Sequence, residues 1–269
     1  MQDAAHAITP NGDNVGVLID AWKLLVGRLP TSAIEHADGV ATTFGNVPLS
    51  FLNLSILDRP VADAAHLKAA LGIAIERARA CRHASLVAFC SGWAPADWAD
   101  VVAQAGLKLS LNMTGMAADR LLPARRAAPA LELRLVTDVA TATDLAEVNA
   151  HAYAMAIEQV ECISNLHIWK QNSFGVVGYV DGRPVTSAST FVLGDRIYVA
   201  FVATVPDSHG RGYAEAAFRK AVEHAQNAVG NRRLWLHASD MGRPLYRSMG
   251  FESGAAVPLF EFSEASSAS

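Results

Sequence analysis

The sequence predicts an α/β fold made of two similar halves, each a mixed, mostly antiparallel sheet flanked by helices. Runs rich in β-branched and aromatic residues alternate with stretches in which apolar residues recur at positions i, i+3 and i+4, the spacing of an amphipathic helix. One order of elements, strand, helix, strand, short helix and strand, is found in residues 52–116 and again in residues 198–260. We interpret this repetition as a diverged internal duplication.

Length and composition agree with two domains. The chain has 269 residues, of which 51% are hydrophobic, enough for two cores. The predicted domains are residues 1–121 and 131–269. Between them, residues 122–129 contain two prolines and two arginines, a composition typical of an exposed connector.

Charge and cysteine content exclude several function classes. The net charge of −4 and the lack of a Lys/Arg run disfavour a nucleic-acid partner. The sequence contains no run of about 18 apolar residues, the length needed to span a membrane. Residues 1–15 lack the basic region followed by an apolar region that marks a signal peptide. Cys81, Cys90 and Cys162 have no Cys-x-x-Cys spacing, so we expect reduced thiols, no metal site and a cytoplasmic enzyme.

The elements of the first half follow from this periodicity. Residues 64–80 place six apolar side chains on one helical face, and short helices or strands are expected on either side. In chain order these are a helix at 15–28, strand residues between 44 and 57 interrupted by Gly45 and Pro48, the helix at 64–80, a strand at 85–90, a short helix from Trp98 to Gly106, and a strand with alternating Leu109, Leu111 and Met113.

The second half begins with an alternating strand at 131–136. Thr141 or Thr143 can cap the helix that follows, and residues 158–170 would form a second helix and its loop. Asp181-Gly182 predicts a hairpin between strands at 175–180 and 185–192. Gly194-Asp195 then turns the chain into a strand that ends at Val205.

The junction at residues 206–214, Pro-Asp-Ser-His-Gly-Arg-Gly-Tyr-Ala, leads from this strand into a strongly amphipathic helix. The first turn of a helix leaves about four N–H groups without intrahelical partners and carries about half a positive charge. Gly210 and Gly212 allow the backbone to approach an anion closely. We therefore predict a phosphate site here, although an ordinary glycine-rich turn would look similar.

A second motif makes the prediction specific. Leu-Tyr-Arg-Ser-Met-Gly-Phe at residues 245–251 follows a strand-like run at 234–237. In this order and spacing, the two motifs resemble the acetyl-CoA site of the GNAT superfamily of N-acetyltransferases, over about residues 131–262. Two positions differ from the usual pattern: His209 replaces Gln or Arg, and Ser239 replaces Asn.

The resemblance implies an acetyl-CoA-dependent enzyme and assigns its residues. Tyr246 would protonate the leaving thiolate, although a tyrosine there could also be a core aromatic. The strand residues would pair with the pantetheine arm and supply the oxyanion donor, or simply pair within the sheet, and the turn residues would surround the pyrophosphate. The implied cofactor-binding residues are Val202, Ala203, Thr204, Val205, His209, Gly210, Arg211, Gly212, Tyr213, Ala214 and Ser239.

The first half has lost this chemistry. The residues that link its strand to its helix, 58–65, contain no glycine, and the position that corresponds to Tyr246 falls near Val102, which has no proton to donate. We therefore expect it to bind no CoA. It could form one wall of the amine site or act as a purely structural partner.

The expected function is direct transfer of an acetyl group to a primary amine of a small molecule such as an amino acid, a polyamine or an aminated antibiotic. A protein N-terminus or lysine is the alternative substrate, and a non-catalytic acyl-CoA-binding regulatory module is the competing class. The oligomeric state stays open. Candidates for the general base are Glu158, Glu161, His167, Asp195 and Tyr198.

Overall fold

The computed structural model describes residues 10–262, and all statements on structure refer to this range. The first nine residues of the segment judged for a signal peptide, and the outer ends of both predicted domains, lie outside it. The described strands form one sheet of eleven, in the order β1-β2-β3-β4-β11-β5-β10-β9-β8-β7-β6. The predicted mixed, mostly antiparallel architecture is confirmed.

The first half contains helices, strands and two short 3-10 turns in the predicted order. A hairpin of β1 and β2 was not predicted, although Asp38-Gly39, both with positive φ, is the signal of a two-residue turn. The elements are α1 (Pro10–Val26), β1 (Ala33–Ala37), β2 (Val40–Phe44), η1 (Ser50–Leu52), β3 (Asn53–Leu57), α2 (Ala64–Arg79), β4 (Leu86–Ala88), η2 (Ser91–Trp93), α3 (Trp98–Gln104) and β5 (Leu107–Ala118).

The second half repeats this order with one more strand at its start. The predicted threonine cap of α4 is wrong: Asp138 is the N-cap, and its carboxylate accepts the N–H of Thr141, which returns a bond as the third helical residue. The elements are β6 (Glu132–Leu135), α4 (Val139–Ala152), α5 (Ile157–Val160), η3 (Glu161–Ser164), β7 (Ser173–Val180), β8 (Arg183–Leu193), β9 (Arg196–Thr204), η4 (Pro206–Ser208), α6 (Tyr213–Val229), β10 (Arg233–Ser239), α7 (Arg243–Ser248) and β11 (Glu252–Phe262).

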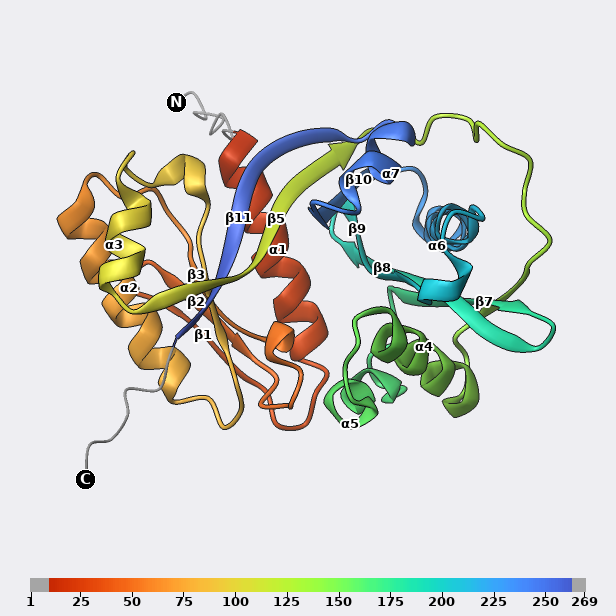
Figure 1. The fold of residues 1–269 in the computed structure, drawn as a ribbon, viewed down its shortest axis with the longest axis horizontal. Coiled ribbons are helices and arrows are strands. Elements are labelled where there is room, and N and C mark those ends of the chain that lie inside the picture. Colours follow the sequence, from red (N-terminus) through yellow and green to blue (C-terminus); the bar gives the residue numbers. More distant parts are fainter. Residues whose placement is uncertain (1–9, 263–269) are drawn as a thin grey trace, which may run out of the picture.

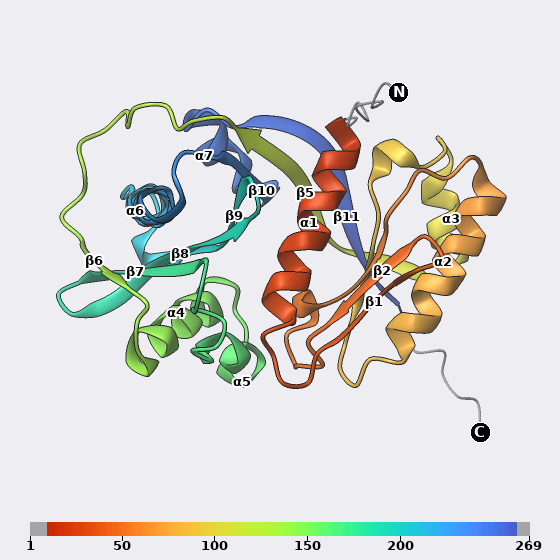
Figure 2. The same cartoon turned by 180° about the vertical axis from the view of Figure 1, so that it is seen from behind.

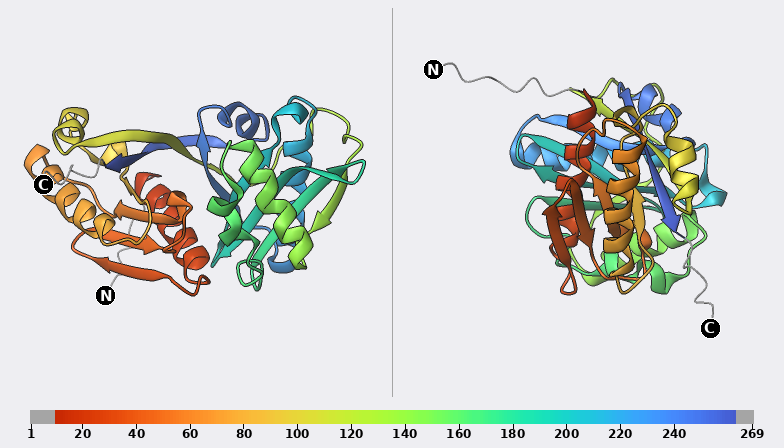
Figure 3. Two further views of the ribbon diagram at one scale, coloured as in Figure 1. Left: turned by 60° about the horizontal axis from the view of Figure 1, so that its bottom comes forward. Right: turned by 90° about the vertical axis from the view of Figure 1, so that its left-hand side faces the viewer.

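The two halves exchange their last strands. β11, from the end of the chain, pairs with β4 of the first half, whereas β5 pairs with β10 of the second half. Between them β5 and β11 pair with each other, and Figure 3 shows the two long strands crossing from one half to the other. Met113 lies opposite Val257, and each is seven residues beyond the equivalent glycine, Gly106 or Gly250. A local twofold axis of the duplication therefore passes between these two residues.

Helices cover both faces of the sheet. α1 and α4 lie on one face, where a single apolar cluster joins residues of both halves, including Trp22 of α1, Leu145 of α4 and Tyr198 of β9. α6 and α7 cover the other face of the second half, and α2 and α3 that of the first (Figures 1 and 2). Since α1 packs against the strands of both halves, the two halves have a shared core.

Arg28, just after α1, ties the first half to a loop of the second. Its guanidinium donates to the carbonyl of Ile168 (2.6 Å), the hydroxyl of Ser173 (2.6 Å) and the carbonyl of Gln171 (2.5 Å). Burial lowers the pKa of Arg28. One planar side chain thus satisfies three acceptors at once, a geometry that a lysine cannot reproduce.

We expect Arg28→Met to lower the free energy of unfolding by about 2 kcal/mol, because charge-assisted hydrogen bonds are lost and their acceptors are left unpaired. Urea unfolding measures this change. Arg134→Met is the control, since Arg134 forms an exposed ion pair with Glu132 (2.7 Å) and lies over the ring of Tyr179 (4.3 Å to the centroid), without contact to the other half, and should change stability less. Equal effects of the two variants would contradict a role for Arg28 in joining the halves.

Candidate active site

The parallel strands β9 and β10 separate before they end, which opens the sheet. Their pairing stops at Tyr198 and Trp235, although β9 continues to Thr204 and β10 to Ser239. The register of β9 against β8 slips in this region, and Phe201 has a φ of 50°. A positive φ is strained for an aromatic residue and marks a bulge that turns the strand. The gap is an opening at the carboxyl ends of two parallel strands.

The four predicted strand residues lie along one side of this opening. Val202, Ala203 and Thr204 are the last residues of β9, and Val205 follows directly. The carbonyl of Val202 accepts the hydroxyl of Tyr153 (3.1 Å). Beyond Tyr198 this side of β9 no longer pairs with β10, and a strand edge of this kind can add another extended chain as a further strand.

The glycine turn adopts the predicted geometry. Gly210 and Gly212 have φ values of 74° and 81°, and a Cβ atom on either would meet no atom within 4 Å. Gly212 is the N-cap of α6 and offers no side chain to the first turn. The N-termini of α2 and α4 are each capped by an aspartate carboxylate, of Asp63 and Asp138. Because α6 has no such side-chain cap, the N–H groups at its start are available to an external anion.

The side chains around the turn divide into two groups. His209 places Nε2 2.8 Å from the carbonyl of Thr204, so that the ring donates to the strand end, and Arg211 donates to the carbonyl of Asp207 (3.3 Å). Both side chains are exposed beside the turn. The ring of Tyr213 instead packs against Val185 and Val205. Tyr213 and Ala214 can therefore contribute their backbone N–H groups to an anion site, because both lie in the first turn of α6.

Tyr246 lies in α7 on the other side of the opening. Its ring packs against Phe218 and Phe251, at centroid distances of 5.7 and 6.0 Å, as a core aromatic would. Burial raises the pKa of Tyr246, and the nearby hydroxyl of Tyr153 raises it further. The phenol therefore keeps its proton over the physiological pH range and is a donor.

Ser239 ends β10 at the start of this helix. Its hydroxyl accepts the N–H of Gly242 at 3.4 Å, and a Cβ on Gly242 would lie 3.1 Å from the ring of Tyr246. Ser239 thus holds the turn that carries the tyrosine.

Two polar features of the opening were missed or only partly anticipated by the sequence. Tyr153, at the end of α4, has no local sequence feature that distinguishes it. Tyr198 was a candidate base, and its hydroxyl lies 3.0 Å from Nδ1 of His237 in β10. The Nε2 atom of His237 is buried, although the residue is partly exposed, and burial lowers the pKa of His237 to about 3.

The other candidate bases lie outside this cluster. Glu158, Glu161 and His167 are exposed. Asp195 is exposed in a turn, where it pairs with Arg196 (3.3 Å). Of the five candidates, Tyr198 is the one that the fold places under the opening.

His237 should make the folded protein sensitive to acid. An unfolded histidine takes up a proton near pH 6.5, whereas the folded His237 does so near pH 3. Between these values the unfolded state binds more protons, so the free energy of unfolding falls as the pH decreases, by at most about 1.4 kcal/mol per pH unit. Urea unfolding between about pH 7 and pH 4 should show a shallower dependence for His237→Gln than for wild type. Identical slopes would contradict the buried, neutral state of the ring.

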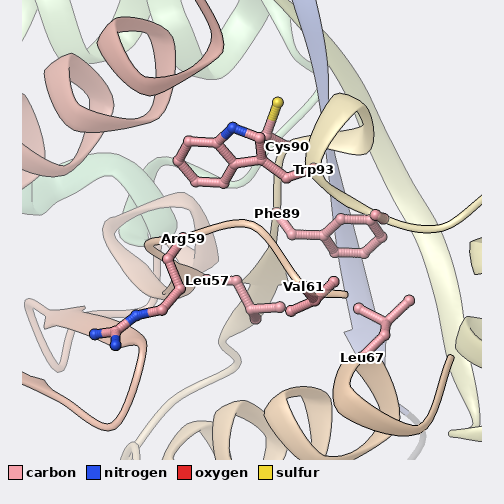
Figure 4. Close-up of a pocket in the computed structure, with 8 residues that line it drawn as sticks. Leu57, Arg59, Val61, Leu67, Phe89, Cys90 and Trp93 are labelled. Atoms are coloured by element: carbon pink, nitrogen blue, oxygen red, sulfur yellow. The ribbon is translucent and has the colours of Figure 1, made fainter. Parts of the chain in front are cut away.

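The equivalent place in the first half is closed. The backbone N–H of Val61 donates to the carbonyl of Trp93 (3.1 Å), which joins the loop after β3 to the turn after β4. Figure 4 shows Phe89, Val61 and Leu67 gathered there, while the guanidinium of Arg59 points away from them. In addition, the carboxylate of Asp63 accepts the N–H of His66 at the start of α2, which fills the place of an external anion.

The described range contains neither a metal site nor a membrane-spanning helix. Within residues 10–262, no group of three or more His, Cys, Asp or Glu side chains is arranged to hold a metal ion. None of the helices described is both long and apolar enough to cross a membrane.

Comparison with known proteins gives one family match, and it lies in the second half. Residues 143–251 match the sequence model of the acetyltransferase (GNAT) family. No curated protein matches the chain.

Solved structures share the fold over nearly the whole chain. A GCN5-related N-acetyltransferase from Kribbella flavida has a TM-score of 0.65 at 18% identity and covers 94% of this chain and 97% of its own. One from Sphaerobacter thermophilus has a TM-score of 0.57 at 13% identity, with coverages of 94% and 92%. A tandem GNAT protein from the clavulanic acid biosynthesis pathway has a TM-score of 0.50 at 14% identity, with coverages of 92% and 94%. At these identities the likeness concerns the fold.

Proposed function

Because residues 143–251 match the sequence model of the acetyltransferase (GNAT) family, we propose that the protein transfers an acetyl group from acetyl-CoA to a primary amine of a small molecule. One observation supports this most strongly. The opened strand pair β9 and β10 lies beside α6, whose N-terminus has no side-chain cap among the described residues. In the first half the corresponding strands and helix are closed and capped by the protein itself.

In this proposal the cofactor follows the opening. The N–H groups of residues 210–214 hold the pyrophosphate at the start of α6, with His209 and Arg211 beside it. The pantetheine arm pairs with Val202, Ala203, Thr204 and Val205, and the hydroxyl of Tyr153 gives up its bond to Val202 as the arm enters. Ser239 supports the opposite side, through the turn that carries Tyr246.

The reaction is a direct displacement. The free-base amine attacks the thioester carbonyl, a backbone N–H of the β9 bulge stabilises the oxyanion, and the C–S bond breaks. Tyr246 donates its proton to the departing thiolate, and the nitrogen loses its extra proton to solvent. No covalent intermediate with the enzyme is formed.

Release of free CoA thiol from acetyl-CoA tests the proposal. Glycine, lysine, putrescine, 2-aminoethanol, glucosamine and kanamycin, each offered separately, cover amino acids, polyamines, amino alcohols and aminated antibiotics. We expect at least one of them to accelerate thiol release and to appear as its N-acetyl product by mass spectrometry. Release with a peptide but with none of these amines would favour the protein substrate, and CoA binding without any turnover would favour a regulatory module.

We also expect one CoA per chain. Within residues 10–262, only the second half combines the glycine turn, the uncapped helix and the open strands, whereas Asp63 occupies the start of α2. Isothermal titration calorimetry should give a stoichiometry of one, and Asp63→Ala should leave it at one, because the opening beside α2 stays closed by the Val61 to Trp93 bond. A stoichiometry of two in the wild type would contradict the assignment of the site to the second half alone.

A further inference from the structure

Two buried polar atoms, one from each half, lie under the opening between β9 and β10 without a hydrogen-bond partner among the described residues. They are Oδ1 of Asn14 in α1 and Nε2 of His237 in β10. Asn14 is 1% exposed. A buried polar group that lacks its hydrogen bond costs about 1–3 kcal/mol, so two such atoms on neighbouring strand positions point to a ligand that completes them.

The register of the sheet places these two side chains together. His237 lies opposite Gly115 of β5, and directly opposite residues project from the same face with Cβ atoms about 4.5–5.5 Å apart. Gly115 has no side chain, and a Cβ atom there would lie 1.6 Å from Oδ1 of Asn14. The amide of Asn14 therefore occupies the place beside His237 that a side chain of residue 115 would take. Met113 and Trp235, on the same face of these strands, pack in the cluster that contains α1.

The hydrogen-bonding character of each atom follows from its other contacts. Nδ2 of Asn14 donates to the carbonyl of Ala255 (3.0 Å), so Oδ1 is the free acceptor. The hydroxyl of Tyr198 lies 3.0 Å from Nδ1 of His237 and has no other acceptor in the described structure. It therefore donates to Nδ1, and the neutral ring carries its own hydrogen on Nε2. The pair thus offers one acceptor and one donor.

We infer that Asn14 and His237 form a substrate subsite shared between the halves, which takes a neutral group of the amine substrate able to accept one hydrogen bond and donate another, a free-base amino group or a hydroxyl. The inference rests on the proposed function. His237 is two residues beyond Trp235, the last residue of β10 paired with β9, so the subsite lies at the base of the opening.

The neutrality of the subsite decides which form of the substrate group it accepts. Asn14, Tyr198 and His237 supply neutral donors and acceptors, and none of them offers a counter-charge. A charged group would lose its hydration there without compensation. The free-base amine is also the form that attacks a thioester, so the subsite and the chemistry select the same species.

Steady-state kinetics on the amine of the six-compound panel with the fastest turnover tests the inference. We expect Asn14→Leu and His237→Gln each to raise the KM for the amine about 10- to 100-fold, because a buried hydrogen bond of the bound group is left unmade. The KM for acetyl-CoA should not change. The double variant should show less than the product of the two single effects, because both residues hold one group. If Asn14→Leu does not fold, the smaller Asn14→Ser takes its place.

Asn53→Leu is the matched control. Asn53 is a buried asparagine of the first half, its Nδ2 donates to Val47 and Ala84, and its Oδ1 also has no partner in the described range. It lies on β3, away from the opening, so its variant should keep the amine KM of wild type.

Three results would overturn the inference. An unchanged amine KM in both Asn14→Leu and His237→Gln would mean that water alone completes the two atoms. An equal rise of the amine KM in Asn53→Leu would mean that the variants act through a general loss of stability and not through a subsite. If the wild-type protein acetylates no amine, both the proposed function and the subsite are wrong. If the wild type acetylates an amine and the variants keep its KM, only the subsite is wrong.

Discussion

Replacing Tyr246 by Phe should lower kcat about 10²- to 10⁴-fold while the KM for acetyl-CoA stays near its wild-type value. The variant keeps the ring and its contacts with Phe218 and Phe251, at 5.7 and 6.0 Å, so the core is preserved. It removes a positioned donor for the departing thiolate, and loss of a general acid typically has an effect of this size. A fall in kcat at constant KM marks an interaction made in the transition state.

Steady-state assays at about pH 6, 7.5 and 9 would measure this effect. Burial raises the pKa of Tyr246, so the wild-type hydroxyl remains protonated across this range, and the deficit of the variant should be the same at each pH. Tyr213→Phe serves as the control, because the ring of Tyr213 packs against Val185 and Val205 instead. If Tyr246→Phe turns over an identified amine as fast as wild type while chemistry limits the rate, the tyrosine is only a core aromatic.

Replacing Gly212 by Val should weaken CoA binding about 100-fold or more and leave the fold in place. The φ of 81° at Gly212 is strained for a β-branched residue, by about 1–3 kcal/mol. Because a Cβ there meets no protein atom within 4 Å, the added side chain occupies the open space at the start of α6. A phosphate would then lose its close approach to the first N–H groups, which are charge-assisted donors.

Calorimetry with CoA measures this affinity, and circular dichroism checks the fold. Gly182→Val is the matched control, because Gly182 has a φ of 78° and equally open surroundings but lies in the hairpin turn between β7 and β8. It should lose similar stability and keep CoA affinity. If Gly212→Val binds CoA with near-wild-type affinity, the turn is not part of the cofactor site.

The sequence predicted most of the helices and strands because each depends on local periodicity. The helices α2 and α6 and the hairpin at Asp181-Gly182 were found from apolar spacing and turn residues within short windows. The cap of α4 was misassigned, since several residues near its start could cap it. Asp138 prevails because its carboxylate and Thr141 form two reciprocal hydrogen bonds.

The candidate site was predictable where it depends on backbone conformation. Gly210 and Gly212 can be recognised from sequence because glycine adopts a positive φ with the least strain of any residue. The absence of glycine from residues 58–65 likewise predicts that the first half lacks this turn. It did not show how that half is closed, because Val61 and Trp93 come together only when the loops after β3 and β4 meet in space.

By itself, the sequence determined a duplicated α/β chain with a GNAT-like second half, a glycine turn at a helix start and a tyrosine in the following short helix. Tertiary structure decided three things: the exchange of β5 and β11 between the halves, the separation of β9 from β10, and the position of Asn14 over Gly115, opposite His237. Each depends on pairing between residues far apart in the chain. Such contacts arise from sheet register and packing, which have no signature in a local window, whereas helix period and turn chemistry do.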